Sequence, residues 1–328
     1  MKLTITSGGS TVENAWGLVG NVIWSGDKQR GARTLTFDLA TSEADPGLPA
    51  VACPVGAVVS YWDDDGTPLF QGVVATRTLS DRDAALAVTA HDRGMYLSGN
   101  DGTIKVRDET AESAVARLCG QYGISVGELA ATGVPLRRKF TGTPVWNIVT
   151  TLYTLAGRQT GAQYLARFEW DLLTVRIRRE QAENLVIRPK SNLITSTTTE
   201  SIEDMRNSVG IYDKDGNRLS TVQDTQAVAL YGLLETHITQ GEDQDARGEA
   251  EQILADRGLS QTVSVECMGN TGLTTGRTVA VQQPMTGLSG IFWIESDRHV
   301  WRDGNYTTTL TLSLRNVGYQ TETGSDLT

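Results

Sequence analysis

Two stretches of this chain, about 220 residues apart, repeat one pattern of strands and turns. The first begins at Gly56 with GAVVSY and continues, after a turn, as LFQGVVATRTLSDRDAALAVTAHD. The second begins at Gly276 with GRTVAV and continues as IFWIESDRHVWRDGNYTTTLTLSL. The offset is 220 for the glycines and 222 for two further pairs, Phe70 with Phe292 and Asp81 with Asp303. Because repeated units bury equivalent surfaces, the repeat predicts two equivalent β units, one near each end of the chain.

The composition agrees with a chain built mostly from β-strands. Its 328 residues include 34 Gly and 41 Thr, but only 8 Pro and 6% aromatic residues. Threonine fits half-buried pleated surfaces and glycine fits tight turns. The length suggests two or three domains, and 39% hydrophobic residues supply cores that need no disulfides. The three cysteines, Cys53, Cys119 and Cys267, are expected to be reduced core residues.

Charge is distributed unevenly along the chain. There are 29 Lys and Arg against 39 Asp and Glu, and the net charge of −10 divides into −4 for residues 1–100, +4 for 101–190 and −10 for 191–328. Broad affinity for nucleic acid or anionic membranes needs clustered basic side chains, so both are disfavoured. Without a signal-peptide-like run or 18 consecutive apolar residues, the chain is expected to be a soluble cytosolic product.

Residues 1–100 are predicted to form the first domain, a set of short strands. The Asp65-Gly66 pair indicates a hairpin whose two central residues need positive φ. The acidic triplet Asp63 to Asp65 lacks the ligand spacing of a calcium loop, which favours a solvated turn. The predicted strands are Lys2–Thr6, Val19–Trp24, Thr34–Leu39, Val58–Trp62, Leu69–Thr78 and Ala84–Ala90.

Residues 101–188 are predicted to form a small α/β domain. One helix follows Asp108 or Thr110 as N-cap and stops at Gly123. In a second helix Thr143 caps, Pro144 occupies the first turn and Gly157 ends the helix. A hairpin of Tyr164–Trp170 and Leu173–Arg179 follows.

Residues 189–328 are predicted to form a second β domain, with a helical insertion near residues 225–258. Hairpins are expected at Asp215-Gly216 and at Asp303-Gly304, and a helix at Asp243–Arg257. The sequence at residues 213–217 resembles half a calcium loop, but its glycine comes two positions early, so a turn is favoured. The last ten residues are polar and are expected to be loose.

The motifs of enzymes are absent or stand in the wrong context. Residues 123–127 match G-x-S-x-G, but a nucleophilic Ser125 would need a strand before it, and a helix precedes it instead. The histidines His91, His237 and His299 are isolated, so a metal or acid/base site would have to be assembled by tertiary folding. The sequence therefore predicts no catalytic, cofactor-binding or metal-binding residues.

Two kinds of site stay open at this point. Carboxylates are plentiful, so a paired-carboxylate glycosidase is compatible with the sequence, although the seven Trp residues are scattered. Two basic clusters could bind an acidic partner, but a solvated surface is the favoured interpretation. These clusters are Arg137, Arg138 and Lys139, and Arg176, Arg178 and Arg179.

The arrangement as a whole resembles the baseplate hub family of contractile phage tails and phage-tail-like particles, in its XkdQ/YqbQ branch, which is related to late control protein D. The segments that carry the resemblance are the N-terminal β unit, DETAESAVARLCGQYGISVGELAATG, TPVWNIVTTLYTLAGRQTG with Tyr164, SIEDMRNSVGIYDKDG, ALYGLLE around Tyr231-Gly232, and the β unit from Gly276 to Leu314. The loop at residues 268–270 departs from the family pattern.

The resemblance implies a structural protein and not an enzyme. Hubs of this kind are homotrimers in which each chain supplies two tail-tube-like β-barrel domains and a small α/β domain, giving a pseudo-sixfold ring. One face would match a hexameric tail tube or tube-initiator protein, and the other a trimeric spike. The hub would seed tube assembly in the bacterial cytoplasm and reside in the virion baseplate, near wedge and tape measure proteins.

The same resemblance makes DNA a passing cargo and not a ligand. We hypothesise that part of the acidic surface lines the central channel, where like-charge repulsion keeps DNA from adhering. An alternative function is a peptidoglycan-binding or wall-degrading tail component, since Thr110–Thr132 has a faint LysM-like pattern. No membrane partner is expected.

Overall fold

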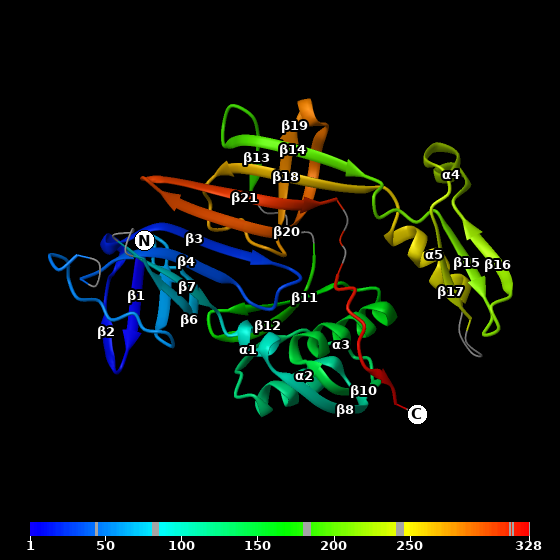
Figure 1. Ribbon diagram of the computed structural model, residues 1–328, viewed down its shortest axis with the longest axis horizontal. Coiled ribbons are helices and arrows are strands. Elements are labelled where there is room, and N and C mark those ends of the chain that lie inside the picture. The colour runs from blue at the N-terminus through cyan, green and yellow to red at the C-terminus, as the bar shows by residue number, and fades with distance from the viewer. Residues whose placement is uncertain are drawn as a thin grey trace. The chain divides into compact units, whose positions relative to one another are not determined.

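The computed structural model describes residues 1–42, 45–80, 85–179, 185–240, 246–314, 316 and 318–327 (Figure 1). Strands predominate over helices in these residues, which confirms a mainly β fold with α+β additions. The chain divides into two compact units, one of Met1–Ser196 with Ser264–Thr328 and one of Thr197–Val263. The three domain ranges given above stay a prediction.

The first β repeat is an antiparallel sheet with the strand order β3-β4-β7-β6-β5-β1-β2. Buried and half-buried residues alternate along β4, so one face of the sheet covers a core that includes Leu35, Phe37 and Leu39. The strands are β1 (Lys2–Ser7), β2 (Ser10–Val12), β3 (Val19–Asp27), β4 (Thr34–Ala40), β5 (Val58–Trp62), β6 (Pro68–Leu79) and β7 (Ala85–His91), with a 3₁₀ turn at Trp16–Leu18.

The second β repeat has the order β14-β18-β21-β20-β19-β13. A 3₁₀ turn at Pro284–Thr286 separates β19 from β20. The strands are β13 (Val186–Ile187), β14 (Leu193–Ser201), β18 (Ser260–Met268), β19 (Thr278–Gln283), β20 (Leu288–Arg302) and β21 (Asn305–Ser313).

The strand pairings confirm the internal repeat. Gly56 and Gly276 both have φ of 89°, and their N–H groups donate to Val74 O at 2.9 Å and Ile294 O at 2.8 Å. The register of β6 against β7 shifts between residues 74 and 76, and that of β20 against β21 shifts between 294 and 296. The structural offset between β6 and β20 is therefore 220 throughout, including a matching bulge.

This register corrects the match of Phe70 with Phe292. Val59 pairs with Gly72 and Val279 with Phe292, so Phe292 is the counterpart of Gly72. The Phe70 ring lies over Gly72, because a Cβ on that glycine would come within 2.4 Å of Phe70 Cζ. The same volume is thus filled by a phenyl ring in both repeats, from residues two positions apart on one face of the strand.

The two repeats are joined into one thirteen-stranded sheet, because β20 of the second repeat pairs antiparallel with β3 of the first. The family resemblance implied two tail-tube-like β-barrel domains. In the described residues neither repeat closes on itself, since the strand order ends at β2 on one side and at β14 on the other. Long β20 is the shared strand that makes the sheet continuous.

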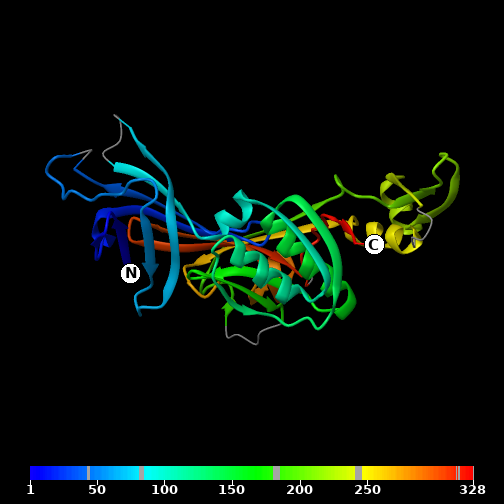
Figure 2. The ribbon, with the colours of Figure 1, turned by 90° about the horizontal axis from the view of Figure 1, so that it is seen from below.

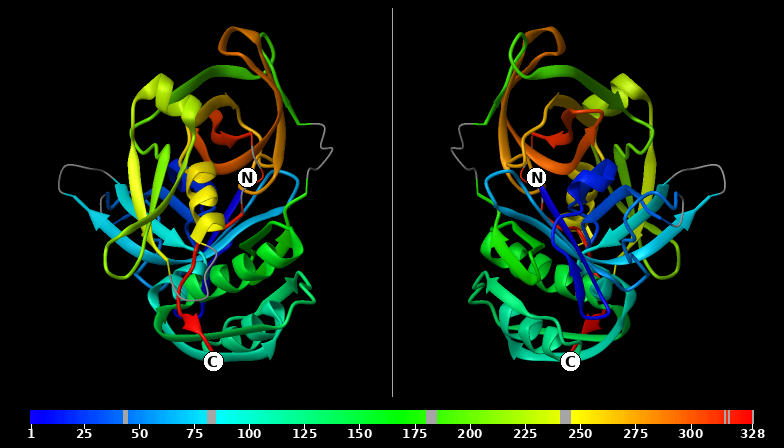
Figure 3. Two further views of the ribbon diagram at one scale, coloured as in Figure 1. Left: turned by 90° about the vertical axis from the view of Figure 1, so that its right-hand side faces the viewer. Right: turned by 90° about the vertical axis from the view of Figure 1, so that its left-hand side faces the viewer.

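An α/β domain follows the first repeat and packs beside the large sheet (Figures 2 and 3). Helices α2 and α3 form one core with two three-stranded sheets, of order β22-β10-β8 and β11-β12-β9. Its elements are α1 (Gly94–Gly99), β8 (Asp101–Glu109), α2 (Ala111–Gln121), β9 (Val126–Leu129), β10 (Leu136–Pro144), α3 (Val145–Thr160), β11 (Tyr164–Glu169), β12 (Leu172–Ile177) and β22 (Ser325–Asp326).

Both predicted helices and the predicted hairpin are present, but the ends assigned to α3 were wrong. Thr143 lies in strand β10 and does not cap, and Pro144 is the N-cap residue. The helix continues through Gly157 and ends at Gly161, whose φ is 74°. Gly157 serves instead for close packing, since a Cβ there would lie 2.7 Å from Ala162 O.

The expectation of a loose C-terminal segment was also wrong. Strand β22 pairs with β10, where Arg138 lies opposite Asp326 and donates to its carboxylate at 2.6 Å. Tyr319 is buried against the α/β core, and its hydroxyl both donates to Ala166 O (3.0 Å) and accepts from Ala166 N (3.1 Å). The segment after β21 therefore ties the second repeat to the α/β domain.

The unit of Thr197–Val263 has a three-stranded sheet of order β16-β15-β17 covered by α5. The Asp215-Gly216 hairpin between β15 and β16 is confirmed. The predicted helix at Asp243–Arg257 is present as α5 from Ala246 to Asp256, and residues 243–245 of the prediction lie outside the described residues. The elements are β15 (Ser208–Tyr212), β16 (Arg218–Gln223), α4 (Thr225–Tyr231), β17 (Glu235–Thr239) and α5 (Ala246–Asp256).

Candidate functional site

The seam between the two β repeats contains buried charges. Asp297 on β20 lies opposite Gly26 on β3, and its carboxylate is fully buried. The Arg33 guanidinium donates to both carboxylate oxygens, at 3.0 and 2.5 Å, and the backbone N–H and hydroxyl of Thr275 donate to one of them at 2.6 Å each. Burial alone would raise the pKa of Asp297, but the charges of Arg33 and His299 and their hydrogen bonds lower it.

His299 continues this cluster along β20. Its Nε2 lies 3.2 Å from Asp297 Oδ2, and its Nδ1 lies 2.9 Å from the Tyr306 hydroxyl and 3.1 Å from the Thr308 hydroxyl. The ring packs against Trp24 with centroids 4.8 Å apart and has no exposed surface. An Asp–His pair buried in this way is not accessible to a substrate, so we assign it a structural role.

A second buried group of charges joins the α/β domain to β20. Arg178 Nη2 lies 2.8 Å from Glu295 Oε1, and Lys28 contacts the other oxygen of the same carboxylate. The Arg178 guanidinium also lies over the Trp293 ring, 4.8 Å from its centroid. Burial is the main reason why the pKa of Lys28 is lowered, against the opposing effect of Glu295. Glu295 is the bulge residue of β20, so the bulge aims this carboxylate at the seam.

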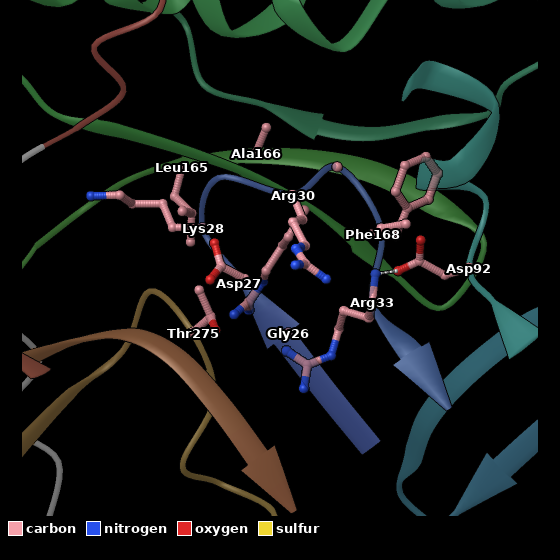
Figure 4. A pocket seen from close by; sticks show the side chains of 13 residues that line it. Gly26, Asp27, Lys28, Arg30, Arg33, Asp92, Leu165, Ala166, Phe168 and Thr275 are labelled. Carbon is pink, nitrogen blue, oxygen red and sulfur yellow. Dashed lines mark hydrogen bonds between the residues drawn. The ribbon is translucent and has the colours of Figure 1, made fainter. Parts of the chain in front are cut away.

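A small pocket lies where the three parts of the larger unit meet (Figure 4). The loop from Gly26 to Arg33 forms one wall, and residues of β11 form another. Asp92 accepts hydrogen bonds from the N–H groups of Arg33 (3.0 Å) and Gly94 (2.8 Å), and its burial raises its pKa to about 7. The backbones approach closely, since a Cβ on Gly94 would lie 1.7 Å from Gly31 O. This geometry indicates a structural role, in which the residues around the pocket hold the three parts together.

The histidines and the serine considered above lie on different elements. His91 lies on β7, His299 on β20 and Ser125 between α2 and β9, while His237 lies on β17 of the smaller unit. Within the described ranges no three His, Cys, Asp or Glu side chains are placed to hold a metal ion. Cys53, Cys119 and Cys267 are all buried, as predicted. The absence of catalytic, cofactor and metal residues stays an expectation.

The acidic turns bond within themselves. In the first, Thr67 N donates to Asp63 (2.8 Å) and to Asp65 (2.9 Å), and a hydrogen bond with Asp63 is the main cause that lowers the pKa of Asp65 to about 2. Gly66 has positive φ but Asp65 does not, so this turn differs from the two-residue hairpin expected there. Asp213 accepts in the same manner from the N–H groups of Asp215 and Asn217.

The two basic clusters are largely occupied by neighbouring carboxylates. Arg138 is buried against Asp326, and Arg137 lies 3.8 Å from Asp108. Arg176 bonds to Glu169 at 2.8 Å, and Arg178 belongs to the Glu295 cluster. These contacts favour structural roles over recognition of an acidic partner.

A larger pocket borders the first acidic turn and has mixed charge. It is lined by Trp24 and Trp170, by Asp63, Asp65 and Glu169, and by Arg33, Arg167 and Arg277. Glu169 is held by Arg167 at 2.6 Å and by Arg176 at 2.8 Å. Because Glu169 and both aspartates are engaged in internal bonds, the pocket does not present the free carboxylate pair that a glycosidase uses.

Comparison with known proteins identifies the family. A family model described as YqbQ-like matches residues 22–313. This chain belongs to the YqbQ-like family. It is 22% identical over 306 residues to the phage-like element PBSX protein XkdQ of Bacillus subtilis strain 168, covering 90% of this chain and 93% of XkdQ. Its identity to YqbQ of the same organism is 21%, with 90% and 92% covered.

Solved structures share the fold across almost the whole chain. The 43 kDa tail protein of prophage MuSo2 from Shewanella oneidensis superposes with a TM-score of 0.72 at 13% identity, covering 95% of this chain and 97% of that one. A tail protein from Neisseria meningitidis MC58 gives 0.68 at 15% identity, with 95% of each chain covered. The Escherichia coli c3393 protein, a type VI secretion component described as similar to phage T4 gp27 and gp5, gives 0.56 at 14% identity, covering 100% and 80%.

Within the described residues, no helix is both long and apolar enough to cross a membrane.

Proposed function

We propose that this member of the YqbQ-like family is the structural baseplate hub of a phage tail or phage-tail-like particle. The observation that carries the proposal is the internal repeat, in which two β units share strand order, bulge position and the glycine at φ 89°. Three copies of such a chain present six equivalent β units around one axis. A homotrimer can therefore face a hexameric tail tube, or a tube-initiator ring, and still offer threefold symmetry to a trimeric spike.

The relatives support the same assignment. XkdQ is named as a protein of the phage-like element PBSX, and two of the similar structures are named as tail proteins. The c3393 protein is described as similar to gp27 and gp5 of the T4 tail. In this role the protein resides in the tail baseplate of the virion, seeds tube assembly and contacts wedge or tape measure proteins. The repeats act there as tube-like β units that complete a barrel only in the assembly.

The hub role requires no chemistry from this chain. The buried Asp297, His299 and Glu295 groups are held by Arg33, Arg178 and hydroxyl partners, which suits a rigid frame and not a reacting site. The acidic excess of the chain suits a channel through which DNA passes without adhering. The protein is proposed to be non-enzymatic, with DNA as cargo.

Light scattering and wall binding test the proposal together. The purified protein is expected to have three times the subunit mass of 35.5 kDa, to stay in the supernatant when peptidoglycan is sedimented, and to cause no lysis. A monomer that sediments with peptidoglycan would contradict the hub role. That result would favour the wall-binding alternative, with the mixed-charge pocket at Trp170 as its site.

A further inference from the structure

One strand-to-strand junction is formed inside the chain, between the two repeats. Strand β20 pairs with β19 through Leu288–Trp293, and farther along the same side it pairs with β3 through Ser296–Trp301. Its other side is occupied by β21. The long strand thus has two partners in succession on one side, and the second partner is β3, the strand at one edge of the other repeat.

The first repeat carries the counterpart of this junction without its second partner. Strand β6 pairs with β5 through Pro68–Val73, and with β7 through Val73–Leu79. With the offset of 220, Thr76–Leu79 of β6 correspond to Ser296–His299 of β20. In the part of the chain that the structure describes, no strand lies beyond β5 along this stretch of β6.

Leu79 is exposed on this stretch of β6, where the described residues supply no second partner strand. Leu79 is 45% exposed, whereas its counterpart His299 is 0% exposed because β3 and Trp24 cover it. Thr76 and Thr78 of β6 are also exposed. Leu79 is thus exposed at the position that a partner strand covers in the other repeat.

Strand β14 supplies the other half of such a junction. It lies beside β18 as β3 lies beside β4, but in the described residues it has no neighbour on its second side. Its sequence, LITSTTTES, has no Pro or Lys, and none of its side chains is buried. Proteins normally protect a long free edge with charge, proline or short length, and the opposite edge strand β2 has only three residues.

We propose that β14 of one copy pairs antiparallel with Thr76–Leu79 of β6 in a second copy, which reproduces the β3–β20 junction between chains. This inference rests on the proposed homotrimeric hub and names the surfaces that join its subunits. The contact is heterologous, β14 to β6, so each copy uses both surfaces once and three copies close into a ring. The open sheet of one chain then becomes a continuous sheet around the channel.

The internal junction also supplies the register. Strands β3 and β14 each have nine residues. Aligned end to end, Thr198 corresponds to Trp24 and Glu200 to Gly26, so that Thr198 faces Leu79 and Glu200 faces Arg77. The latter pair brings opposite charges face to face across two strands, which favours this register.

Disulfide trapping tests this register directly. The variant Leu79→Cys with Thr198→Cys is expected to form covalent ladders up to three copies under mild oxidation, because directly opposed Cβ atoms lie within disulfide reach. The native cysteines are buried and add little background. The matched control is Leu79→Cys with Thr199→Cys, in which a slip of one residue moves the second thiol to the other face, so at least about ten times less ladder is expected.

The outcomes separate this inference from the function on which it rests. A trimer by light scattering in which both cysteine pairs cross-link equally, or neither does, would overturn the β14–β6 junction and leave the hub intact. A monomeric wild-type protein would overturn the trimeric hub itself. As a second measurement, Leu79→Lys is expected to lower the trimer fraction, whereas Leu172→Lys, at a similarly exposed position on β12, is expected to leave it unchanged.

Discussion

The two β repeats have one backbone frame but different interiors. Phe70 and Gly72 in the first repeat correspond to Gly290 and Phe292 in the second, and the exposed Leu79 corresponds to the buried His299. The frames also differ in a connection, because a six-residue loop links β3 to β4, whereas residues 202–259, which make up most of the unit of Thr197–Val263, lie between β14 and β18. The two repeats thus keep the same strand order and bulge position although their side chains differ. Buried charge, at Asp297, is found where β20 has β3 as a partner strand.

The largest expected effect comes from removing the charge of Asp297, which lies in the second repeat where β3 covers β20. Asp297→Asn leaves the Arg33 guanidinium without its carboxylate in a mostly buried site, so we expect a loss of about 3–5 kcal/mol in the free energy of unfolding. Arg77→Gln at the equivalent position of β6 is the control, with an expected loss of no more than about 1 kcal/mol. Urea titration followed by circular dichroism measures both losses. Equal losses would show that the charge of Asp297 stabilises the fold no more than the charge at the equivalent position of β6.

The matched glycines give the next largest effect. Gly56 and Gly276 share a φ of 89°, so Ala at either position is strained by about 1–2 kcal/mol. A Cβ on Gly276 would also lie 1.9 Å from Leu165 Cδ2, whereas a Cβ on Gly56 meets nothing within 4 Å. We expect Gly276→Ala to cost about 1–3 kcal/mol more than Gly56→Ala in urea unfolding. Equal costs would mean that the Leu165 side chain on β11 moves aside easily when a Cβ is added at Gly276.

The fold was more predictable from the sequence than the buried charges were. Alternating patterns and turn residues gave the strands, the hairpins and the repeat, because these signals are local. The Phe70–Phe292 match was wrong because one ring reaches over Gly72, which only cross-strand register reveals. The Arg33–Asp297 pair joins residues 264 positions apart. The one available signal was that Asp297 and His299 stand two positions apart in a predicted strand and so share one face of it.

The two carboxylates bonded to Arg33 are expected to respond to pH in opposite directions. Burial raises the pKa of Asp92 to about 7, so its contribution to stability is complete below the unfolded value near 3.8 and is lost as pH rises through 7. The pKa of Asp297 is lowered, so its contribution is present above 3.8 and is lost in stronger acid. Between pH 4 and 7, Asp92→Asn is expected to remove a stability slope of up to about 1.4 kcal/mol per pH unit.

Urea midpoints measured at several pH values test this contrast. Because Asn satisfies only one of the two N–H groups that Asp92 accepts from, the variant is expected to be less stable overall, so the slope and not the absolute value is diagnostic. An unchanged slope would mean that Asp92 is ionised in the folded protein at neutral pH.

The smallest expected effect on the single chain is at Leu79. Because this side chain is 45% exposed and lies where no partner strand is present within the chain, Leu79→Ser should change the free energy of unfolding by less than about 0.5 kcal/mol in dilute solution. At high protein concentration the wild-type melting temperature should rise through assembly, and that of Leu79→Ser should rise less. If both proteins have the same melting temperature at every concentration, Leu79 is an ordinary surface residue. The two repeats would then differ only in their buried side chains and not in a surface that binds a second copy.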